Sequence, residues 1–150
     1  MISLRKIKLQ DRDLLFKWRN LDQIVSLSSS KKTVRYNEHI SWFDGIISSE
    51  NVLAYIIENS SKKSVGHIRF EKNSKEYCTL TVYLLPSETG QGLGVEAIRI
   101  GCSNVSDLWG DVRIIANVVS SNLEAQSAFR KADFKRDKSN KFRGHVTFIL

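Results

Sequence analysis

Apolar and polar residues alternate along several short stretches of this chain, as they do in strands whose two faces meet different surroundings. The clearest case is "YCTLTVYLL" (77–85), where Cys78, Leu80, Val82 and Leu84 fall on one side and tyrosines and threonines on the other. Turn-prone segments such as "NSSKK" and "NSKE" separate the middle strands, which favours an antiparallel meander. The pattern predicts strands at residues 2–9, 52–58, 64–71, 77–85, 112–119 and 145–150.

Other stretches repeat apolar residues every three or four positions, which is the spacing of one helical face. Asp11 can cap a helix through "DRDLLFKWRN", and a second helix is predicted in "RYNEHISWFDGII" (35–47). A longer helix follows three closely spaced glycines, and its expected core residues are Ile98, Cys102, Val105 and Leu108. A last helix, capped by Ser121 or Asn122, lies in "SNLEAQSAFRKADF", and its expected core residues are Leu123, Ala128 and Phe129.

The predicted order of elements is β-α-α-β-β-β-α-β-α-β, with room for one more strand near the end. This order indicates a mixed sheet that is antiparallel in its first part and has one strand–helix–strand crossover in its middle. At 150 residues the chain is long enough for one domain that buries about two-thirds of its unfolded surface. The sequence therefore predicts a single α/β (α+β) domain over residues 1–150.

The composition is that of an ordinary globular protein, with 41% hydrophobic and 9% aromatic residues. The longest apolar runs are a few residues, far below the ~20 needed to span a bilayer. The N-terminus lacks the apolar core of a signal peptide. No membrane partner is expected, and the cytoplasm is the expected location.

The net charge of the chain indicates which classes of partner to expect. The chain has 23 Lys and Arg against 16 Asp and Glu, a formal net charge of +7, which favours anionic partners such as a phosphorylated ligand. The late basic stretch "FRKADFKRDKSNKFRGH" (129–145) is interpreted as a solvated face, because no nucleic-acid-binding module accompanies it. Nucleic acid is therefore not an expected partner.

Two cysteines, Cys78 and Cys102, lie in predicted regular structure without a CxxC motif or a cluster of histidines. We expect both to be buried free thiols, since Cys behaves as a small core residue. A metal site or a nucleophile is the less favoured interpretation. No metal cofactor is expected.

The segment "PSETGQGLGVEAI" (86–98) places glycines at 90, 92 and 94 between an alternating strand and a helix. A Walker loop requires GxxxxGK followed by Ser or Thr, which does not occur here. A Rossmann fingerprint starting at Gly90 would put Val95 at its third glycine, with only about sixty residues left for the domain. Glycines let the backbone approach a ligand, and free N–H groups in the first helical turn suit a pyrophosphate. From the loop alone, a turn that binds nothing remains the alternative.

With the residues that follow it, this loop resembles the acyl-CoA signature of the GNAT (Gcn5-related) N-acetyltransferase superfamily. That signature is Arg or Gln, two residues, Gly, one residue, then Gly or Ala; Thr89 stands in its first place and Gly92 and Gly94 in the glycine places. Downstream the family has an Asn, an aromatic residue seven positions on and a Phe five beyond, matched by Asn122, Phe129 and Phe134. The order of elements matches over essentially the whole chain.

The resemblance implies a GNAT-type mixed, mostly antiparallel sheet of 6–7 strands flanked by helices, with strands 77–85 and 112–119 splayed apart. It implies acetyl-CoA as co-substrate, with the pyrophosphate on the loop N–H groups and the pantetheine arm beside the strand backbone. Asn122 is expected to hydrogen-bond the pantetheine. The implied cofactor-binding residues are Val82, Tyr83, Leu84, Thr89, Gly90, Gln91, Gly92, Leu93, Gly94, Val95, Asn122 and Phe129.

Acetyl transfer requires a deprotonated amine, a polarised thioester carbonyl and a proton for the departing thiolate. The amide of Leu84 is the expected oxyanion donor. The family's Tyr general acid is Phe129 here, and the Glu that some relatives use as a base is Asn117, which hydrogen-bonds but takes no proton. Tyr83, the nearest hydroxyl, and His67, with a suitable pKa, are the catalytic candidates beside Asn117. Water in both roles, and His67 as a structural residue on a sheet face, remain open.

Three segments indicate the amine that accepts the acetyl group, because they resemble one branch of the superfamily. They are "WRN" (18–20), "EHISWF" (38–43) and "VGHIRF" (65–70). That branch acetylates primary amines of nucleotide-linked amino sugars in nonulosonic-acid and other surface-polysaccharide pathways, by direct attack on the thioester. The substrate-binding residues that this implies are Arg19, His39, Trp42 and Arg69.

Two other functions stay open at this level. The WRN-like opening also occurs in enzymes that acetylate protein N-termini, including those of ribosomal proteins. The missing Tyr and Glu also leave room for a non-catalytic module that binds acyl-CoA. The sequence determines neither the sugar nor the oligomeric state, for which a homodimer is one option.

Overall fold

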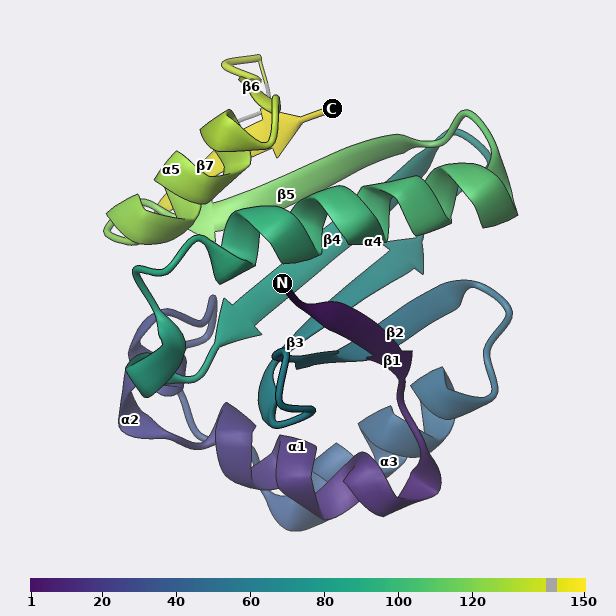
Figure 1. Ribbon diagram of the computed structural model, residues 1–150, viewed down its shortest axis with the longest axis vertical. Helices are drawn as coiled ribbons and strands as arrows, with labels where there is room; N and C mark the ends of the chain where they lie inside the picture. Colours follow the sequence, from purple (N-terminus) through teal and green to yellow (C-terminus); the bar gives the residue numbers. More distant parts are fainter. Residues whose placement is uncertain (140–142) are drawn as a thin grey trace.

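A seven-stranded mixed sheet forms the centre of the computed structural model, which describes residues 1–139 and 143–150. The strands lie in the order β1-β2-β3-β4-β5-β7-β6 (Figure 1). Among these strands the neighbours pair antiparallel, except for β4 and β5, which run parallel. The bounds are β1 Ser3–Lys6, β2 Val52–Glu58, β3 Ser64–Lys72, β4 Tyr77–Leu84, β5 Arg113–Val119, β6 Lys135–Arg136 and β7 His145–Ile149.

Helices flank the sheet, which confirms the predicted fold class. In the described residues they are α1 Arg12–Arg19, α2 Asp22–Ser26, α3 Tyr36–Ile47, α4 Leu93–Trp109 and α5 Leu123–Lys131, with short 3-10 turns at Leu9–Asp11 and Pro86–Glu88. The hydrophobic pattern predicts all of these helices except α2, whose five residues are too few to show a period. The two-residue strand β6 is not predicted for the same reason.

The two faces of the sheet carry separate hydrophobic clusters. Ile56 of β2 packs with Leu15 of α1 and Phe43 of α3. Its neighbours Tyr55 and Ile57 point the other way and join the cluster that contains the buried residues of α4 and α5. We call the two sides the α1/α3 face and the α4/α5 face. In Figure 1, α4 runs in front of the sheet, and α1 and α3 lie together at the bottom of the view.

Helix α4 packs closely on β3 because Gly101 has no side chain. A Cβ at this position would lie 2.7 Å from the ring of Phe70. Ile98 and Val105 are buried as expected, but Leu108 is 62% exposed, so that prediction is wrong. At 3.6 residues per turn Leu108 points about 80° away from Ile98, which takes it off the buried stripe. Leu123 is 71% exposed, a further error, because it is the first residue of α5 and faces away from the sheet.

Strands β4 and β5 separate along their length, as the resemblance implies. Their parallel pairing covers only Tyr77 to Thr79 of β4 and Arg113 to Ile115 of β5. Beyond it, β4 stays paired with β3 as far as Leu84, and β5 stays paired with β7. Figure 1 shows β4 and β5 side by side at one end and apart at the other. The separation opens the sheet near its middle.

Several other expectations concern the surface and the thiols. Both cysteines are free, as expected, and Cys78 is buried, but Cys102 is only half-buried, so the expectation of burial is wrong for Cys102. The lysines and arginines of the basic stretch 129–145 are exposed where they are described, while residues 140–142 lie outside the described residues. None of the described helices combines the length and apolar character needed to cross a bilayer. In the same residues, no three His, Cys, Asp or Glu side chains are grouped to hold a metal ion.

Candidate active site

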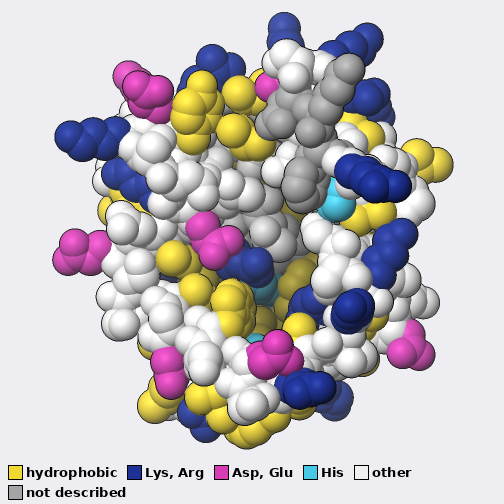
Figure 2. Space-filling view, turned by 180° about the vertical axis from the view of Figure 1, so that it is seen from behind, with side chains coloured by type: hydrophobic (Ala, Val, Ile, Leu, Met, Phe, Trp, Pro, Cys, Tyr) yellow, Lys and Arg dark blue, Asp and Glu magenta, His cyan; other side chains and the backbone are white. Residues whose placement is uncertain are grey.

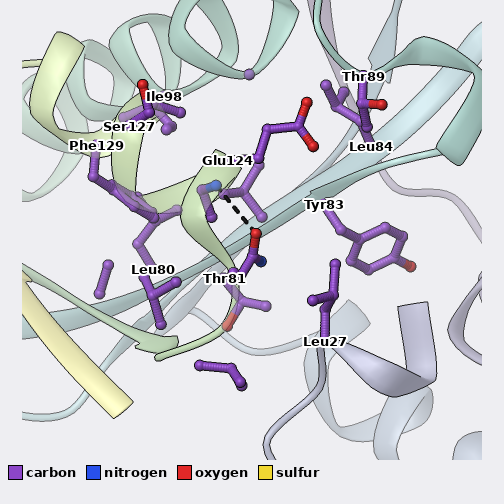
Figure 3. Close-up of a pocket in the computed structure, with 18 of the residues that line it drawn as sticks. Leu27, Leu80, Thr81, Tyr83, Leu84, Thr89, Ile98, Glu124, Ser127 and Phe129 are labelled. Carbon is purple, nitrogen blue, oxygen red and sulfur yellow. Dashed lines mark hydrogen bonds between the residues drawn. The ribbon is translucent and has the colours of Figure 1, made fainter. Parts of the chain in front are cut away.

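A pocket of about 580 Å³ occupies the opening between β4 and β5. Its lining comes from both faces of the sheet: Phe129 of α5 on the α4/α5 face, and Arg19 of α1 on the α1/α3 face. Figure 3 shows Tyr83 and Leu27 on one side of the pocket and Phe129 and Ser127 on the other. Figure 2, which views the molecule from behind, shows a hollow near the centre of that face, with hydrophobic and basic side chains in it. The pocket therefore offers a passage through the sheet.

The end of β4 presents free backbone groups to this opening. Leu85 N–H donates to the carbonyl of Val65 at 2.8 Å, and the register of β3 with β4 is regular up to that point. In an antiparallel pair, alternate residues direct their N–H and C=O groups away from the partner strand. The backbone groups of Val82 and Leu84 are therefore directed at the opening, where β5 has already separated. They can pair with an extended ligand, and Leu84 N–H can polarise a carbonyl.

The glycine loop lies at one end of the pocket and leads into α4. Gly90 and Gly92 have φ values of 79° and 78°, a left-handed conformation that glycine adopts without strain. Gly92 directly precedes the helix, so the free N–H groups of the first turn of α4 face the loop. The Thr89 hydroxyl donates to the carbonyl of Pro86 at 3.1 Å. Its side chain thus stabilises the turn before the loop.

Asn122 and Phe129 place α5 against the pocket. Asn122 is the N-cap of α5, and its Oδ1 accepts a hydrogen bond from Ala125 N–H at 3.1 Å, drawn dashed in Figure 3. Its Nδ2 remains available to donate to a ligand. Phe129 is 2% exposed and packs against Phe134 and Phe148, with ring centroids 5.1 and 5.9 Å away. The residue at the family's Tyr position is thus a core residue that also contacts the pocket.

Most of the predicted cofactor residues meet in this one place. Those that line the pocket are Val82, Tyr83, Leu84, Thr89, Gly90, Gly92, Gly94, Val95, Asn122 and Phe129. Gln91 and Leu93 are not among the lining residues. Gln91 lies between the two left-handed glycines and Leu93 is the first residue of α4, so both positions can contribute to the site through their backbone N–H groups.

Tyr83 and two arginines form the polar part of the pocket on the α1/α3 face. Burial raises the pKa of Tyr83, while nearby Arg69 and Arg19 act in the opposite direction. Arg19 donates to the carbonyl of Lys32 at 3.2 Å and to Ser30 Oγ at 3.3 Å. Burial lowers the pKa of Arg19, and Arg69 adds to this effect. Among the described residues Arg19 has no carboxylate partner.

His67 does not reach the pocket. It is 1% exposed, and its Nδ1 donates to the carbonyl of Tyr55 at 2.9 Å. Burial, with a smaller effect of Arg69, lowers the pKa of His67 to about 3. The expectation that His67 has a pKa suited to a general base is therefore wrong, because the ring is enclosed behind Tyr83, with the two ring centroids 5.7 Å apart. Its Nε2 has no hydrogen-bond partner within the described chain.

His39 and Trp42, predicted to contact the acceptor, are also absent from the pocket lining. His39 is 2% exposed, and its Nε2 donates to the carbonyl of Arg12 at 2.6 Å, which ties α3 to α1. Trp42 instead stacks on Arg69, whose guanidinium carbon lies 5.1 Å from the ring centroid. Arg69 also contacts Glu71 at 3.3 Å. The aromatic side chain therefore holds a pocket arginine in place.

Asn117 lies at the pocket as predicted, and the structure adds a partner that the sequence did not suggest. Asn117 is on β5, and Thr147 is directly opposite it on β7. The hydroxyl of Thr147 donates to Asn117 Oδ1 at 2.7 Å. Thr147 is 2% exposed, so this contact is shielded from water.

The serine-rich segment after α2 forms a wall of the pocket, although its sequence indicates no more than a loop. Ser28, Ser29 and Ser30 line the pocket beside Leu27. Ser29 Oγ lies 2.9 Å from Nε2 of His145 on β7. The segment therefore spans the opening from α1 to β7. Serine enrichment was the available signal, but it gave no indication of which part of the fold the segment would cover.

Several solved structures share this fold. Aminoglycoside acetyltransferase AAC(6')-Ib in complex with coenzyme A is 18% identical, with 100% of this chain and 94% of that chain covered and a TM-score of 0.84. Spermidine N-acetyltransferase from Vibrio cholerae, in complex with CoA and spermine, is 14% identical over 99% and 92% of the two chains, with a TM-score of 0.83. The Campylobacter jejuni N-acetyltransferase PseH is 16% identical over 99% and 96%, with a TM-score of 0.72. At these identities the similarity concerns the fold.

Sequence comparison assigns the family. No curated protein matches the chain. The model of the acetyltransferase (GNAT) domain matches residues 2–135, which include the glycine loop, the end of β4 and Asn122. The opened sheet, the free backbone of β4 and the glycine loop fit acetyl-CoA as the co-substrate. The chain therefore belongs to the GNAT acetyltransferase domain family and is an acetyl-CoA-dependent N-acetyltransferase.

Proposed function

We propose that this enzyme acetylates the primary amine of a nucleotide-linked amino sugar. The observation that carries the proposal is the charge of the pocket on the α1/α3 face, where Arg19 and Arg69 line it. Among the described residues of the lining, the one carboxylate is Glu124, which lies at the start of α5 near the glycine loop. An acceptor that enters from the α1/α3 face therefore meets guanidinium groups.

Such a face favours an anionic acceptor over a polycation. Two like charges about 5 Å apart near a protein surface repel by about 3 kcal/mol, and opposite charges attract by a similar amount. Arg19 is free to bind an anion because its contacts are a carbonyl and a hydroxyl. Guanidinium groups match the geometry of phosphate oxygens. A nucleoside diphosphate attached to the sugar supplies such oxygens, whereas aminoglycosides and polyamines carry several positive charges.

The other parts of the pocket support acetyl transfer at a neutral pH. Acetyl-CoA supplies the activated acetyl group. Leu84 N–H, directed into the opening, is placed to polarise a carbonyl, and Tyr83 keeps its proton because burial raises its pKa. Tyr83 is therefore the candidate proton donor to the departing sulfur. Neither Asn117 nor the buried His67 is a base, so the amine proton is expected to leave through water.

A panel of amines tests the proposal. The enzyme is mixed with acetyl-CoA and, in turn, a uridine-diphosphate-linked amino sugar, spermidine, an aminoglycoside and a peptide with a free N-terminus, and release of the CoA thiol is followed. We expect turnover of the nucleotide-linked sugar at least tenfold faster than that of the polycations. Faster turnover of the peptide would replace the proposal with N-terminal acetylation of proteins. Acetyl-CoA binding without turnover would leave a non-catalytic module.

A charge-matched pair of variants tests whether the positive charge of Arg19 in the pocket binds the amine substrate. Arg19→Gln should raise the KM for the nucleotide-linked sugar about tenfold or more, since a hydrogen bond between charged groups contributes about 1.5–3 kcal/mol. Lys17→Gln removes the same charge from an exposed position of α1 that does not line the pocket. Its KM should equal that of the wild type. Equal effects of both substitutions would show that only the overall charge matters.

A further inference from the structure

The side-chain amide of Asn117 has one orientation fixed by its surroundings. Thr147 Oγ1 donates to Asn117 Oδ1 at 2.7 Å, so the carbonyl end of the amide faces β7. The side chain of Asn117 is exposed within the pocket, while Thr147 is buried. Among the described residues no hydrogen bond from Asn117 Nδ2 is found, so its N–H groups are available to a ligand in the pocket.

The position of Asn117 in the sheet determines which side of the pocket its side chain reaches. Its neighbours Ala116 and Val118 point into the core of the α4/α5 face, so Asn117 points to the α1/α3 face. It lies two residues beyond Ile115, the last residue of β5 paired with β4. Asn117 is therefore the first residue of this face past the point where the sheet opens. An acceptor that approaches the opening from this face has to pass it.

We propose that Asn117 is a specificity residue that donates a hydrogen bond to an oxygen of the acceptor, and that Thr147 is the positioning residue that holds it in this orientation. The oxygen is one without a proton of its own, such as a carbonyl, ether or phosphate oxygen. The charged groups that line the same face, Arg19 and Arg69, also donate hydrogen bonds and accept none. Together, the amide of Asn117 and the two guanidinium groups favour a substrate that places such oxygens close to its reacting amine.

The same orientation separates Asn117 from a water-activating role. A group that prepares a water molecule to take a proton must accept a hydrogen bond from it. The Thr147 hydroxyl holds Asn117 Oδ1 toward β7, and the end of the amide left for a ligand is Nδ2, which accepts no hydrogen bond. The inference rests on the proposed function only in assuming that the acceptor amine arrives on this face.

Three variants test the inference. Asn117→Asp keeps the oxygen that accepts from Thr147 and replaces the donating nitrogen by a negative oxygen, so the acceptor KM should rise about tenfold or more. Thr147→Val removes the orienting hydroxyl at nearly constant volume and should raise the acceptor KM about threefold to tenfold. Thr147→Ser keeps the hydroxyl and should restore the wild-type value. In all three variants the KM for acetyl-CoA should change much less than the KM for the amine substrate, and the melting temperature should stay close to that of the wild type.

The outcomes separate this inference from the proposed function. The assays use the amine that the wild-type enzyme acetylates fastest, so turnover of a peptide instead of a sugar would refute the proposed function and leave this test intact. An unchanged or lower acceptor KM in Asn117→Asp would overturn the inference. So would equal increases of both KM values, or a failure of Thr147→Ser to restore the wild-type value. Absence of turnover with every amine would refute both proposals.

Discussion

Gly66 of β3 lies opposite Leu84 at the end of β4, and its substitution by Ala tests the proposed role of the Leu84 N–H in catalysis. A Cβ at this position would lie 2.5 Å from the carbonyl oxygen of Tyr83 and 3.1 Å from Cα of Leu84. Both are backbone atoms, so no side-chain rotation relieves the contact. To bring the first distance to 3.0–3.4 Å, the two strands must separate locally by about 0.5–0.9 Å.

This displacement sets the size of the expected effects. A misplacement of about 1 Å in a catalytic group costs about 100-fold in rate, so kcat/KM of Gly66→Ala should fall about tenfold to 100-fold. Overpacking of a core costs about 1–3 kcal/mol. For a chain of this length such a loss corresponds to a decrease of about 3–10 °C in Tm. The measurements are thermal unfolding and steady-state acetyl transfer by the same preparation.

Two other glycines supply the controls. A Cβ added at Gly45 in α3 would have no atom within 4 Å, so Gly45→Ala should leave activity unchanged and stabilise the helix by about 0.5–1 kcal/mol. Gly101→Ala should lower Tm because of the 2.7 Å contact with Phe70, with a smaller loss of activity than Gly66→Ala at equal loss of stability. A folded Gly66→Ala enzyme with wild-type kcat/KM would refute the reasoning.

Two further predictions concern His67 and Asn122. Because burial lowers the pKa of His67 to about 3 from 6.5, only the unfolded chain binds its proton between these values. Its contribution to stability is therefore complete above pH 6.5 and is lost as the pH falls, by up to about 1.4 kcal/mol per pH unit. Between pH 7 and 5 the Tm of the wild type should fall more steeply than that of His67→Asn; equal slopes would contradict this. Asn122→Asp keeps an oxygen that caps α5 but loses Nδ2, so Tm should stay constant while the KM for acetyl-CoA rises about tenfold, and an unchanged KM would remove Asn122 from the cofactor site.

Much of the fold could be predicted from the sequence because its signals are local. The alternation in residues 77–85 depends only on the two-residue period of a strand, and the structure has β4 at Tyr77–Leu84. The glycine loop was recognisable because Gly90 and Gly92 need a backbone conformation that other residues rarely adopt. Asn122 was one of two candidate caps, beside Ser121, because a cap hydrogen bond reaches only three residues along the chain, and the structure shows that Asn122 makes this bond.

The predictions that failed concern what covers each face of the sheet. His67 has the alternation of a strand residue and was a candidate base, with a structural role as the alternative, and in the structure its ring is buried behind Tyr83. His39 was placed on the correct helix, yet its ring points to the backbone of Arg12 instead of the pocket. Period and spacing assign a residue to a face, but they do not say whether that face meets protein or solvent.

The chain's local patterns were sufficient for the longer helices and strands and for the mixed sheet. For the glycine loop they indicated a backbone suited to a pyrophosphate, with a turn that binds nothing as the alternative. Contacts between distant segments created the α1/α3 side of the pocket: Arg19 of α1, Arg69 of β3 and Asn117 of β5 come together there, and Thr147, thirty residues from Asn117, orients its amide. Such contacts depend on how β4 and β5 separate and on which helices cover each face. No short stretch of sequence contains that information, because it arises from the burial of both faces of the sheet at once.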